Sequence, residues 1–307
     1  MPSPPEQLID VGRSVTLCCE RLGDPADPPL LLIAGLGQQL LGWPLGFCEA
    51  LVERGLQVVR FDNRDAGRSW HAPLPPPSRG QLLRRRLDAR QYDLADMAQD
   101  TADLIDALDL RPAHVVGASM GGMIAQMLAA EHPQHVRSLT SIMSTTGARR
   151  AGWTAPSTLR LLFGPPARTR EQAAQRAASM WRHIGSHGFP FDEPMVRDLA
   201  RRAFDRDPHG AAGSGRQLGA IMKSGDRTAR LGAISAPALV IHGDRDRMVH
   251  PSGAQATAAA IPGACRETIA GMGHDLPAGA WPRLVELIAG HAAAADATAG
   301  GIEVVAP

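Results

Sequence analysis

The chain has 307 residues, a formal net charge of +1 and 44% hydrophobic residues. This length suits one sheet-and-helix domain with an insertion, and it is enough to bury a large core. A net charge near zero gives no electrostatic reason to expect binding to nucleic acid or to a membrane surface. No stretch approaches the ~20 continuous apolar residues of a membrane span, and residues 1–7 are polar and Pro-rich, so we expect no signal peptide.

The four cysteines give no sign of a disulfide framework or a metal site. Cys18, Cys19, Cys48 and Cys265 lack C-x-x-C pairing and have no His-rich neighbours at metal-ligand spacing. We therefore expect buried, reduced thiols, no bound metal and a cytoplasmic location.

Short apolar runs alternate with segments of helical periodicity along most of the chain. The alternation indicates a parallel sheet, in which ligands bind outside the carboxyl ends of the strands. The pattern predicts strands at residues 15–21, 29–34, 56–62, 113–117, 136–143, 238–243 and 265–270. It predicts helices at residues 42–54, 94–108, 119–131 and 281–291.

The alternation stops between residues 147 and 230, where the sequence becomes rich in Arg and Ala. Helical periodicity there is interrupted at Pro165-Pro166 and at residues 185–190 and 210–215. We predict a cap of three or four helices over residues 147–230, inserted into a core domain made of residues 1–146 and 231–291. The Ala- and Gly-rich residues 292–307 are expected to form a flexible tail.

Two other segments interrupt the strand-helix rhythm. Residues 79–92 follow a Pro-rich lead-in and are interpreted as a surface excursion. Residues 62–69 follow a strand and mix charges with glycine, which favours a buried turn in which Asp62 and Arg64 satisfy backbone groups. The alternative is that this turn shapes the floor of a site.

The sequence from Gly117 to Gly122, Gly-Ala-Ser-Met-Gly-Gly, joins a predicted strand to a predicted helix. A serine between small residues at such a turn matches a nucleophile elbow, whose strained backbone closes only when the flanking residues are small. Ser119 is therefore the candidate nucleophile.

A serine nucleophile needs a general base, and the base needs a carboxylate that orients it. Asp246 follows the predicted strand at 238–243, and His274 follows the strand at 265–270, which is the chain order that this type of elbow requires. Asp244 is the alternative acid. The other histidines, including His242 and His250, are interpreted as surface or capping residues.

The oxyanion of an acyl-transfer intermediate needs two N–H donors. The amide of Met120, directly after the nucleophile, is one candidate. The other is the amide of Leu36, in the Gly-containing loop after the strand at 29–34, although this loop could also be a simple turn. Gly35, Trp43 and Trp181 are candidate substrate-binding residues.

Over residues 15–291 the chain resembles the α/β-hydrolase superfamily, and within it the aclacinomycin methylesterase-like esterases. The resemblance implies an eight-stranded, mostly parallel sheet under a helical cap, ester hydrolysis without a cofactor, and the roles given above for the candidate residues. The oxyanion loop has Ala34-Gly35 where His-Gly is common, so a contact from that histidine is missing. Besides the elbow, the resemblance rests on Gly23 to Pro28, Leu41 to Pro44, Arg60 to Ser69, Pro262-Gly263 and Gly271 to His274.

These residues predict a serine hydrolase that cleaves a methyl or short acyl ester of a carboxylic acid. A lactonase, a carbon–carbon bond hydrolase or a cofactor-free perhydrolase could use the same triad; Leu36 argues against the perhydrolase, because an aromatic residue commonly stands there in haloperoxidases. A ligand-binding protein without activity is a further alternative, against which the complete triad counts. The expected partner is a small-molecule ester, with no nucleic acid or membrane, and the expected assembly is a monomer or homodimer.

Overall fold

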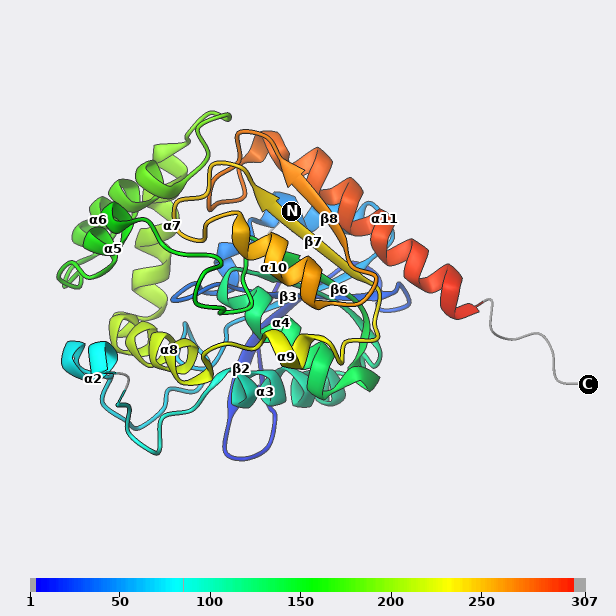
Figure 1. Ribbon diagram of the computed structural model, residues 1–307, viewed down its shortest axis with the longest axis horizontal. Coiled ribbons are helices and arrows are strands. Elements are labelled where there is room, and N and C mark those ends of the chain that lie inside the picture. Colours follow the sequence, from blue (N-terminus) through cyan, green and yellow to red (C-terminus); the bar gives the residue numbers. More distant parts are fainter. Residues whose placement is uncertain (1–3, 85, 301–307) are drawn as a thin grey trace, which may run out of the picture.

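A computed structural model describes residues 4–84 and 86–300 of the chain and contains one eight-stranded sheet (Figure 1). The strand order is β1-β2-β4-β3-β5-β6-β7-β8; β1, β2 and β4 pair antiparallel and all other neighbours pair parallel. The predicted fold class is therefore confirmed. The strands are β1 (Gln7–Asp10), β2 (Thr16–Leu22), β3 (Pro29–Ile33), β4 (Gln57–Phe61), β5 (Ala113–Ala118), β6 (Val136–Ile142), β7 (Ala238–Gly243) and β8 (Cys265–Ile269).

The central strand β3 is apolar on both faces because helices cover both sides of the sheet. Leu30 to Ile33 of β3 are fully buried between β4 and β5, which explains their continuous apolar sequence. The sequence pattern did not reveal β1, a short edge strand of two polar and two apolar residues that pairs with β2 through Gln7 and Cys19. Its partly exposed position requires no apolar run.

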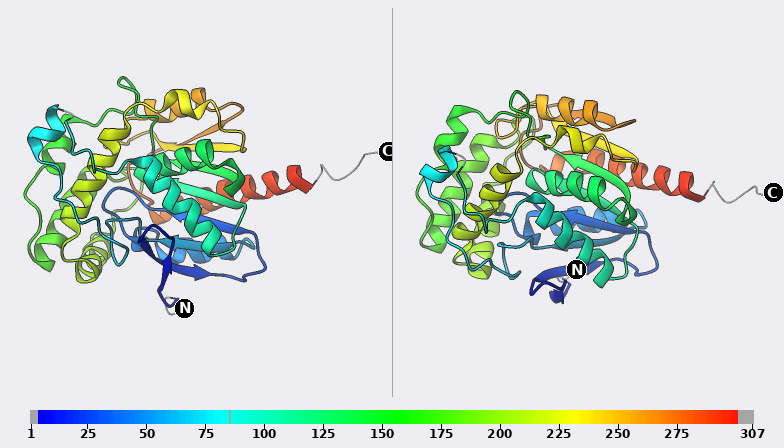
Figure 2. Two further views of the ribbon diagram at one scale, coloured as in Figure 1. Left: turned by 90° about the horizontal axis from the view of Figure 1, so that it is seen from below. Right: turned by 60° about the horizontal axis from the view of Figure 1, so that its bottom comes forward.

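Two layers of helices enclose the sheet (Figures 1 and 2). One face packs against α1 (Leu45–Val52) and α11 (Trp281–Gly300), and the other against α3 (Leu94–Ala107), α4 (Met120–Glu131), α9 (Thr228–Leu231) and α10 (Ser252–Ala260). Short 3-10 helices lie at Leu40–Gly42, Pro133–His135 and Ala278–Ala280. Each layer buries a separate hydrophobic cluster against the strands, so the sheet forms the middle of a three-layer core.

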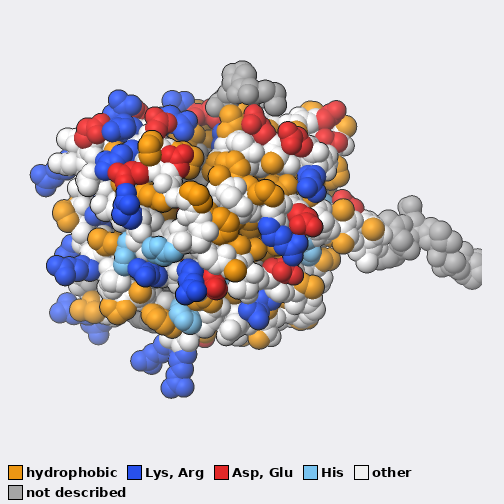
Figure 3. Space-filling model, turned by 90° about the horizontal axis from the view of Figure 1, so that it is seen from above, with side chains coloured by type: hydrophobic (Ala, Val, Ile, Leu, Met, Phe, Trp, Pro, Cys, Tyr) orange, Lys and Arg blue, Asp and Glu red, His pale blue; other side chains and the backbone are white. Residues whose placement is uncertain are grey.

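Four further helices lie together beyond the carboxyl ends of the parallel strands, on the left in Figure 1. They are α5 (Pro156–Leu162), α6 (Arg170–Ile184), α7 (Glu193–Arg206) and α8 (Gly210–Ser224). The short α2 (Arg79–Arg84) is tied to the residue after α5 by a hydrogen bond from Arg79 to the carbonyl of Phe163. Acidic and basic side chains are interspersed on the cap side of the face in Figure 3. We refer to α5–α8 as the cap.

The predicted helix interruption at residues 210–215 is wrong, because α8 runs through it. Its glycines allow close packing instead of breaking the helix. A Cβ at Gly213 would lie 2.0 Å from the carbonyl oxygen of Asp65, and one at Gly219 would lie 2.8 Å from the side-chain oxygen of Gln91. A larger residue at Gly213 would require movement of the backbone, and one at Gly219 would require movement of the Gln91 and Pro77 side chains.

Two other expectations need correction. Residues 292–300 are not a flexible tail but the end of α11, where Ala292 and Ala295 are buried and Asp296 contacts His114 and Arg137. Residues 301–307 lie outside the described residues. Cys265 is exposed, on the edge strand β8, whereas the other three thiols are buried.

Among the residues placed by the structure, no helix combines the length and apolarity needed to cross a membrane.

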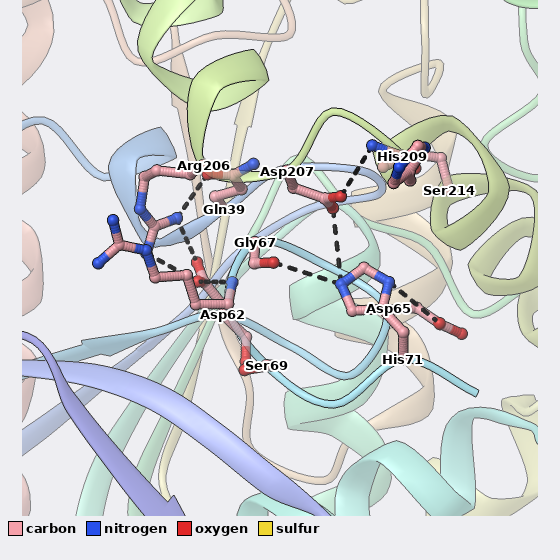
Figure 4. Close-up of polar contacts among 12 residues, drawn as sticks. Gln39, Asp62, Asp65, Gly67, Ser69, His71, Arg206, Asp207, His209 and Ser214 are labelled. Atoms are coloured by element: carbon pink, nitrogen blue, oxygen red, sulfur yellow. Dashed lines mark hydrogen bonds and ion pairs between the residues drawn. The ribbon is translucent and has the colours of Figure 1, made fainter. Parts of the chain in front are cut away.

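Two arginines of the cap form buried ion pairs with the turn that follows β4. Arg206, at the end of α7, contacts Asp62 at 2.9 Å and also the side chain of Gln39 (Figure 4). Arg216, in α8, binds both carboxylate oxygens of Asp65 at 2.9 and 2.5 Å. The turn that the sequence predicted to be buried thus anchors the cap to the core.

We predict that Arg216→Met lowers the free energy of unfolding by about 3 kcal/mol, because the buried Asp65 carboxylate loses its arginine partner and keeps only the hydrogen bonds from Tyr92 and the amide of Ala72 and the contact with His71. Arg202→Met is the control, since Arg202 pairs with Asp198 on the exposed surface and such a pair contributes little. Urea unfolding of both variants measures the difference. Equal stability losses would contradict the anchoring role.

Candidate active site

Ser119 stands in a strained turn between β5 and α4. Its backbone has a φ of 56°, which non-glycine residues rarely adopt. The turn closes because Gly117 and Gly121 have no side chains: a Cβ would lie 2.1 Å from the carbonyl oxygen of Gly121 in the first case and 2.0 Å from that of Ile33 in the second. Ser144 donates a hydrogen bond to the Ser119 carbonyl at 2.8 Å, which further fixes the turn.

The structure brings Ser119, His274 and Asp246 together. His274 Nε2 lies 2.9 Å from Ser119 Oγ, and His274 Nδ1 lies 2.7 Å from Asp246 Oδ2. An ionised carboxylate can only accept hydrogen bonds, so His274 Nδ1 carries the hydrogen. The other nitrogen, Nε2, then has a lone pair that points toward the Ser119 hydroxyl. This is the tautomer that a general base for Ser119 requires.

The Asp246 carboxylate is buried but surrounded by donors. Its Oδ1 accepts hydrogen bonds from the amides of Met248 and Val249, each at 2.8 Å. Burial raises the pKa of Asp246, but the charge of His274 and the hydrogen bonds from His242 and His274 outweigh it, so the net pKa lies below its usual range. Asp246 is therefore the ionised partner of the imidazole at neutral pH.

His242 is not the surface or capping residue that the sequence suggested. Its side chain is 1% exposed, and its Nε2 lies 2.8 Å from the carbonyl oxygen of Val249 and 3.2 Å from Asp246 Oδ2. Both neighbours are acceptors, so Nε2 carries a hydrogen that the two share. His242 lies at the end of β7, and only the folded loop, not a local sequence motif, brings it next to Asp246.

Asp244, the alternative acid, points elsewhere. Its Oδ1 accepts a hydrogen bond from the amide of Gly271 at 2.6 Å, and its other oxygen faces Arg245. Asp244 thus supports the start of the loop that carries His274, and the contact with the imidazole comes from Asp246.

The loop after β3 lies directly against the nucleophile. A Cβ on Gly35 would be 3.4 Å from the Cβ of Ser119, so this loop approaches the serine as closely as ordinary packing allows. Leu36 is partly buried in the same loop, and Met120 is the first residue of α4, where an N–H has no partner within the helix. Their assignment as oxyanion donors remains a prediction.

Comparison with known proteins shows the family to which this chain belongs. A family model described as the alpha/beta hydrolase fold matches residues 28–277. The chain belongs to the α/β-hydrolase family. It is 32% identical to the rhodomycin D methylesterase DauP of Streptomyces sp. strain C5, over 92% of this chain and 96% of that protein. It is also 32% identical to the rhodomycin D methylesterase DnrP of Streptomyces peucetius, over 95% and 99% of the two chains.

Solved structures agree on the fold of this α/β-hydrolase. The enol-lactonase from Burkholderia xenovorans LB400 superposes with a TM-score of 0.71 at 22% identity, covering 94% of this chain and 99% of the other. The family resemblance seen in the sequence is therefore confirmed.

In this α/β-hydrolase, the cap contacts the loop that carries His274. The amide of His274 donates to the carbonyl of Ile184 at 2.8 Å, and the amide of Gly273 donates to Ser186 Oγ at 2.9 Å. Ser186 in turn donates to Asp275 at 2.5 Å. Sequence reasoning missed Ser186, because it lies in a cap loop without a motif and meets His274 only after folding.

The two candidate tryptophans occupy different surroundings. Trp43 is 1% exposed and stacks on Phe47 in the core, with ring centroids 5.9 Å apart. Its role is therefore packing between α1 and the sheet, and its place in the core gives no support to a substrate contact. Trp181 is partly buried on α6 of the cap, and its assignment to substrate binding remains a prediction.

The low pKa of Asp246 predicts a pH-dependent contribution to stability. A carboxyl group with a depressed pKa in the folded state stabilises the fold above its unfolded pKa, here near 3.8, and loses this contribution as the pH falls toward the folded pKa. We expect the difference in free energy of unfolding between wild type and Asp246→Asn to shrink as the pH drops below 3.8. Urea unfolding at several pH values measures it, and a difference that does not change with pH would contradict the assignment.

Proposed function

We propose that this α/β-hydrolase is a serine esterase that cleaves carboxylic esters through an acyl-enzyme. The observation that supports it best is the continuous hydrogen-bonded series from Ser119 through His274 to Asp246, with the imidazole in the tautomer of a general base. The strained turn at Ser119 and the adjoining Gly35 loop complete the arrangement.

In the proposed mechanism, Ser119 Oγ attacks the ester carbonyl carbon while His274 Nε2 takes the hydroxyl proton. The amides of Met120 and Leu36 bind the oxyanion of the tetrahedral intermediate. The intermediate collapses, the C–O bond to the alcohol breaks, and His274 returns the proton to the leaving alkoxide. Water, deprotonated by His274, then attacks the acyl-enzyme, and its proton passes back to Ser119 as the carboxylic acid leaves.

The proposed substrate class is the methyl ester of a carboxylic acid. Two relatives that align over more than nine-tenths of this chain are named methylesterases, which favours methanol as the leaving alcohol. The enol-lactonase likeness lies below 25% identity and so concerns the fold alone. A methyl group is small, so the acid part of the ester would make most of the contacts with the cap.

We predict that Ser119→Ala lowers kcat for methyl ester and p-nitrophenyl ester hydrolysis by about 10⁴-fold or more, because no other group can form the acyl-enzyme. Methanol or nitrophenol release measures the rate. Ser138→Ala is the control, since Ser138 is also buried but hydrogen-bonds to His114 instead of the triad. Unchanged hydrolysis by a folded Ser119→Ala protein would refute the proposal.

The alternative of a ligand-binding protein without activity can be tested separately. A fluorophosphonate reacts covalently with a serine that is activated by a correctly placed imidazole, so we expect stoichiometric labelling of Ser119, found by mass spectrometry of the digested protein. Absence of labelling would favour the non-catalytic alternative.

A further inference from the structure

The loop after β3, residues 34–38, is held in place from two sides. From the core, Asn63 Nδ2 donates to the carbonyl of Ala34 at 3.0 Å. From the cap, the side chain of Gln217 in α8 accepts a hydrogen bond from the amide of Gly37 at 2.8 Å. The loop beside Ser119 is therefore shared between the two parts of the molecule.

Gln217 is fully buried and uses both ends of its amide. Its Oε1 accepts from the Gly37 N–H, and its Nε2 donates to the carbonyl of Arg64 at 2.8 Å. The Gly37 N–H can only donate a hydrogen bond and the Arg64 carbonyl can only accept one, so these two partners fix the orientation of the Gln217 side-chain amide. Gln217 thus links the loop to the turn after β4.

The hydrogen bond at Gly37 acts on a backbone unit that could otherwise rotate. The amide of Gln38 donates to the carbonyl of Gly35 at 3.1 Å, so Leu36 and Gly37 are the central residues of a β-turn, and Gly37 has a positive φ of 66°. The central peptide of such a turn, between these two residues, has alternative orientations that distinguish the turn types. By accepting from Gly37 N–H, Gln217 selects one of them.

The helix that carries Gln217 is itself firmly placed. Arg216, the preceding residue, pairs with the buried Asp65, and a Cβ at Gly37 would lie 2.5 Å from Ser214 Oγ of the same helix. Because α8 is anchored by these contacts, it offers a fixed point against which Gln217 can hold the loop.

We propose that Gln217 is a positioning residue for the oxyanion loop, so that the docked cap helix α8 forms part of the catalytic apparatus. This inference rests on the proposed esterase function and on Leu36 as a donor. Loss of the Gly37 contact frees the peptide next to Leu36, and a displacement of about 1 Å at such a site can reduce the rate roughly 100-fold. The cap thereby affects the rate of the chemical step as well as substrate binding.

The test compares Gln217→Leu, Gln217→Glu and Gln91→Leu with wild type. Gln91→Leu is the matched control, because it removes a buried glutamine amide that donates to the carbonyl of Arg216 at 3.0 Å and does not contact the loop. Fluorophosphonate titration first counts the competent active sites, and kcat is expressed per competent site. A smaller fraction of folded protein in a variant therefore does not lower its measured kcat. Inhibition by a trifluoromethyl ketone, which forms a tetrahedral adduct with a serine Oγ, reports on the oxyanion hole.

We expect Gln217→Leu to lower kcat per site by about 10- to 100-fold with little change in KM. The affinity for the trifluoromethyl ketone should fall by a similar factor. Gln217→Glu keeps an acceptor for Gly37 N–H and should lose less, and Gln91→Leu should keep a kcat per site close to wild type. Wild-type kcat and ketone affinity in both Gln217 variants, or an equal loss in Gln91→Leu, would overturn the inference. A wild-type protein that neither hydrolyses esters nor reacts with the fluorophosphonate would instead overturn the proposed function.

Discussion

The buried charge of Asp246 is the constraint on which the site depends. Removing a carboxylate from water is costly, and this one is stabilised because two backbone amides and two imidazoles donate to it. Its fixed position fixes the His274 ring, whose far nitrogen meets Ser119. The folded loops therefore determine three features together: the ionisation of Asp246, the tautomer of His274 and the hydrogen bond between His274 and Ser119.

The cap adds a second set of constraints at the same edge of the sheet. Buried pairs from Arg206 and Arg216 to the turn after β4 tie α7 and α8 to the core, and the cap loop at Ser186 contacts the segment that carries His274. Such pairs contribute geometric specificity more than stability, because the cost of desolvating the charges offsets much of their attraction. The cap is therefore held in a defined position relative to Ser119, His274 and Asp246.

Local patterns predicted the parts of the molecule that local interactions determine. The elbow at Ser119 was predictable because small residues are needed within a few positions of the serine, and the apolar central strands because both their faces are covered. His242 and Gln217 were not predictable, since each acts on a segment that only folding brings near. The glycines of α8 misled the prediction because they serve packing between distant segments and not a turn.

α11 runs away from the cap, so that its final turns lie at the opposite end of the molecule from α5–α8 (Figures 1 and 2). A bulky group or solid support joined at the end of this helix would sit on the side of the molecule away from the cap. The architecture thus separates the place where the protein can be tethered from the place where small molecules arrive.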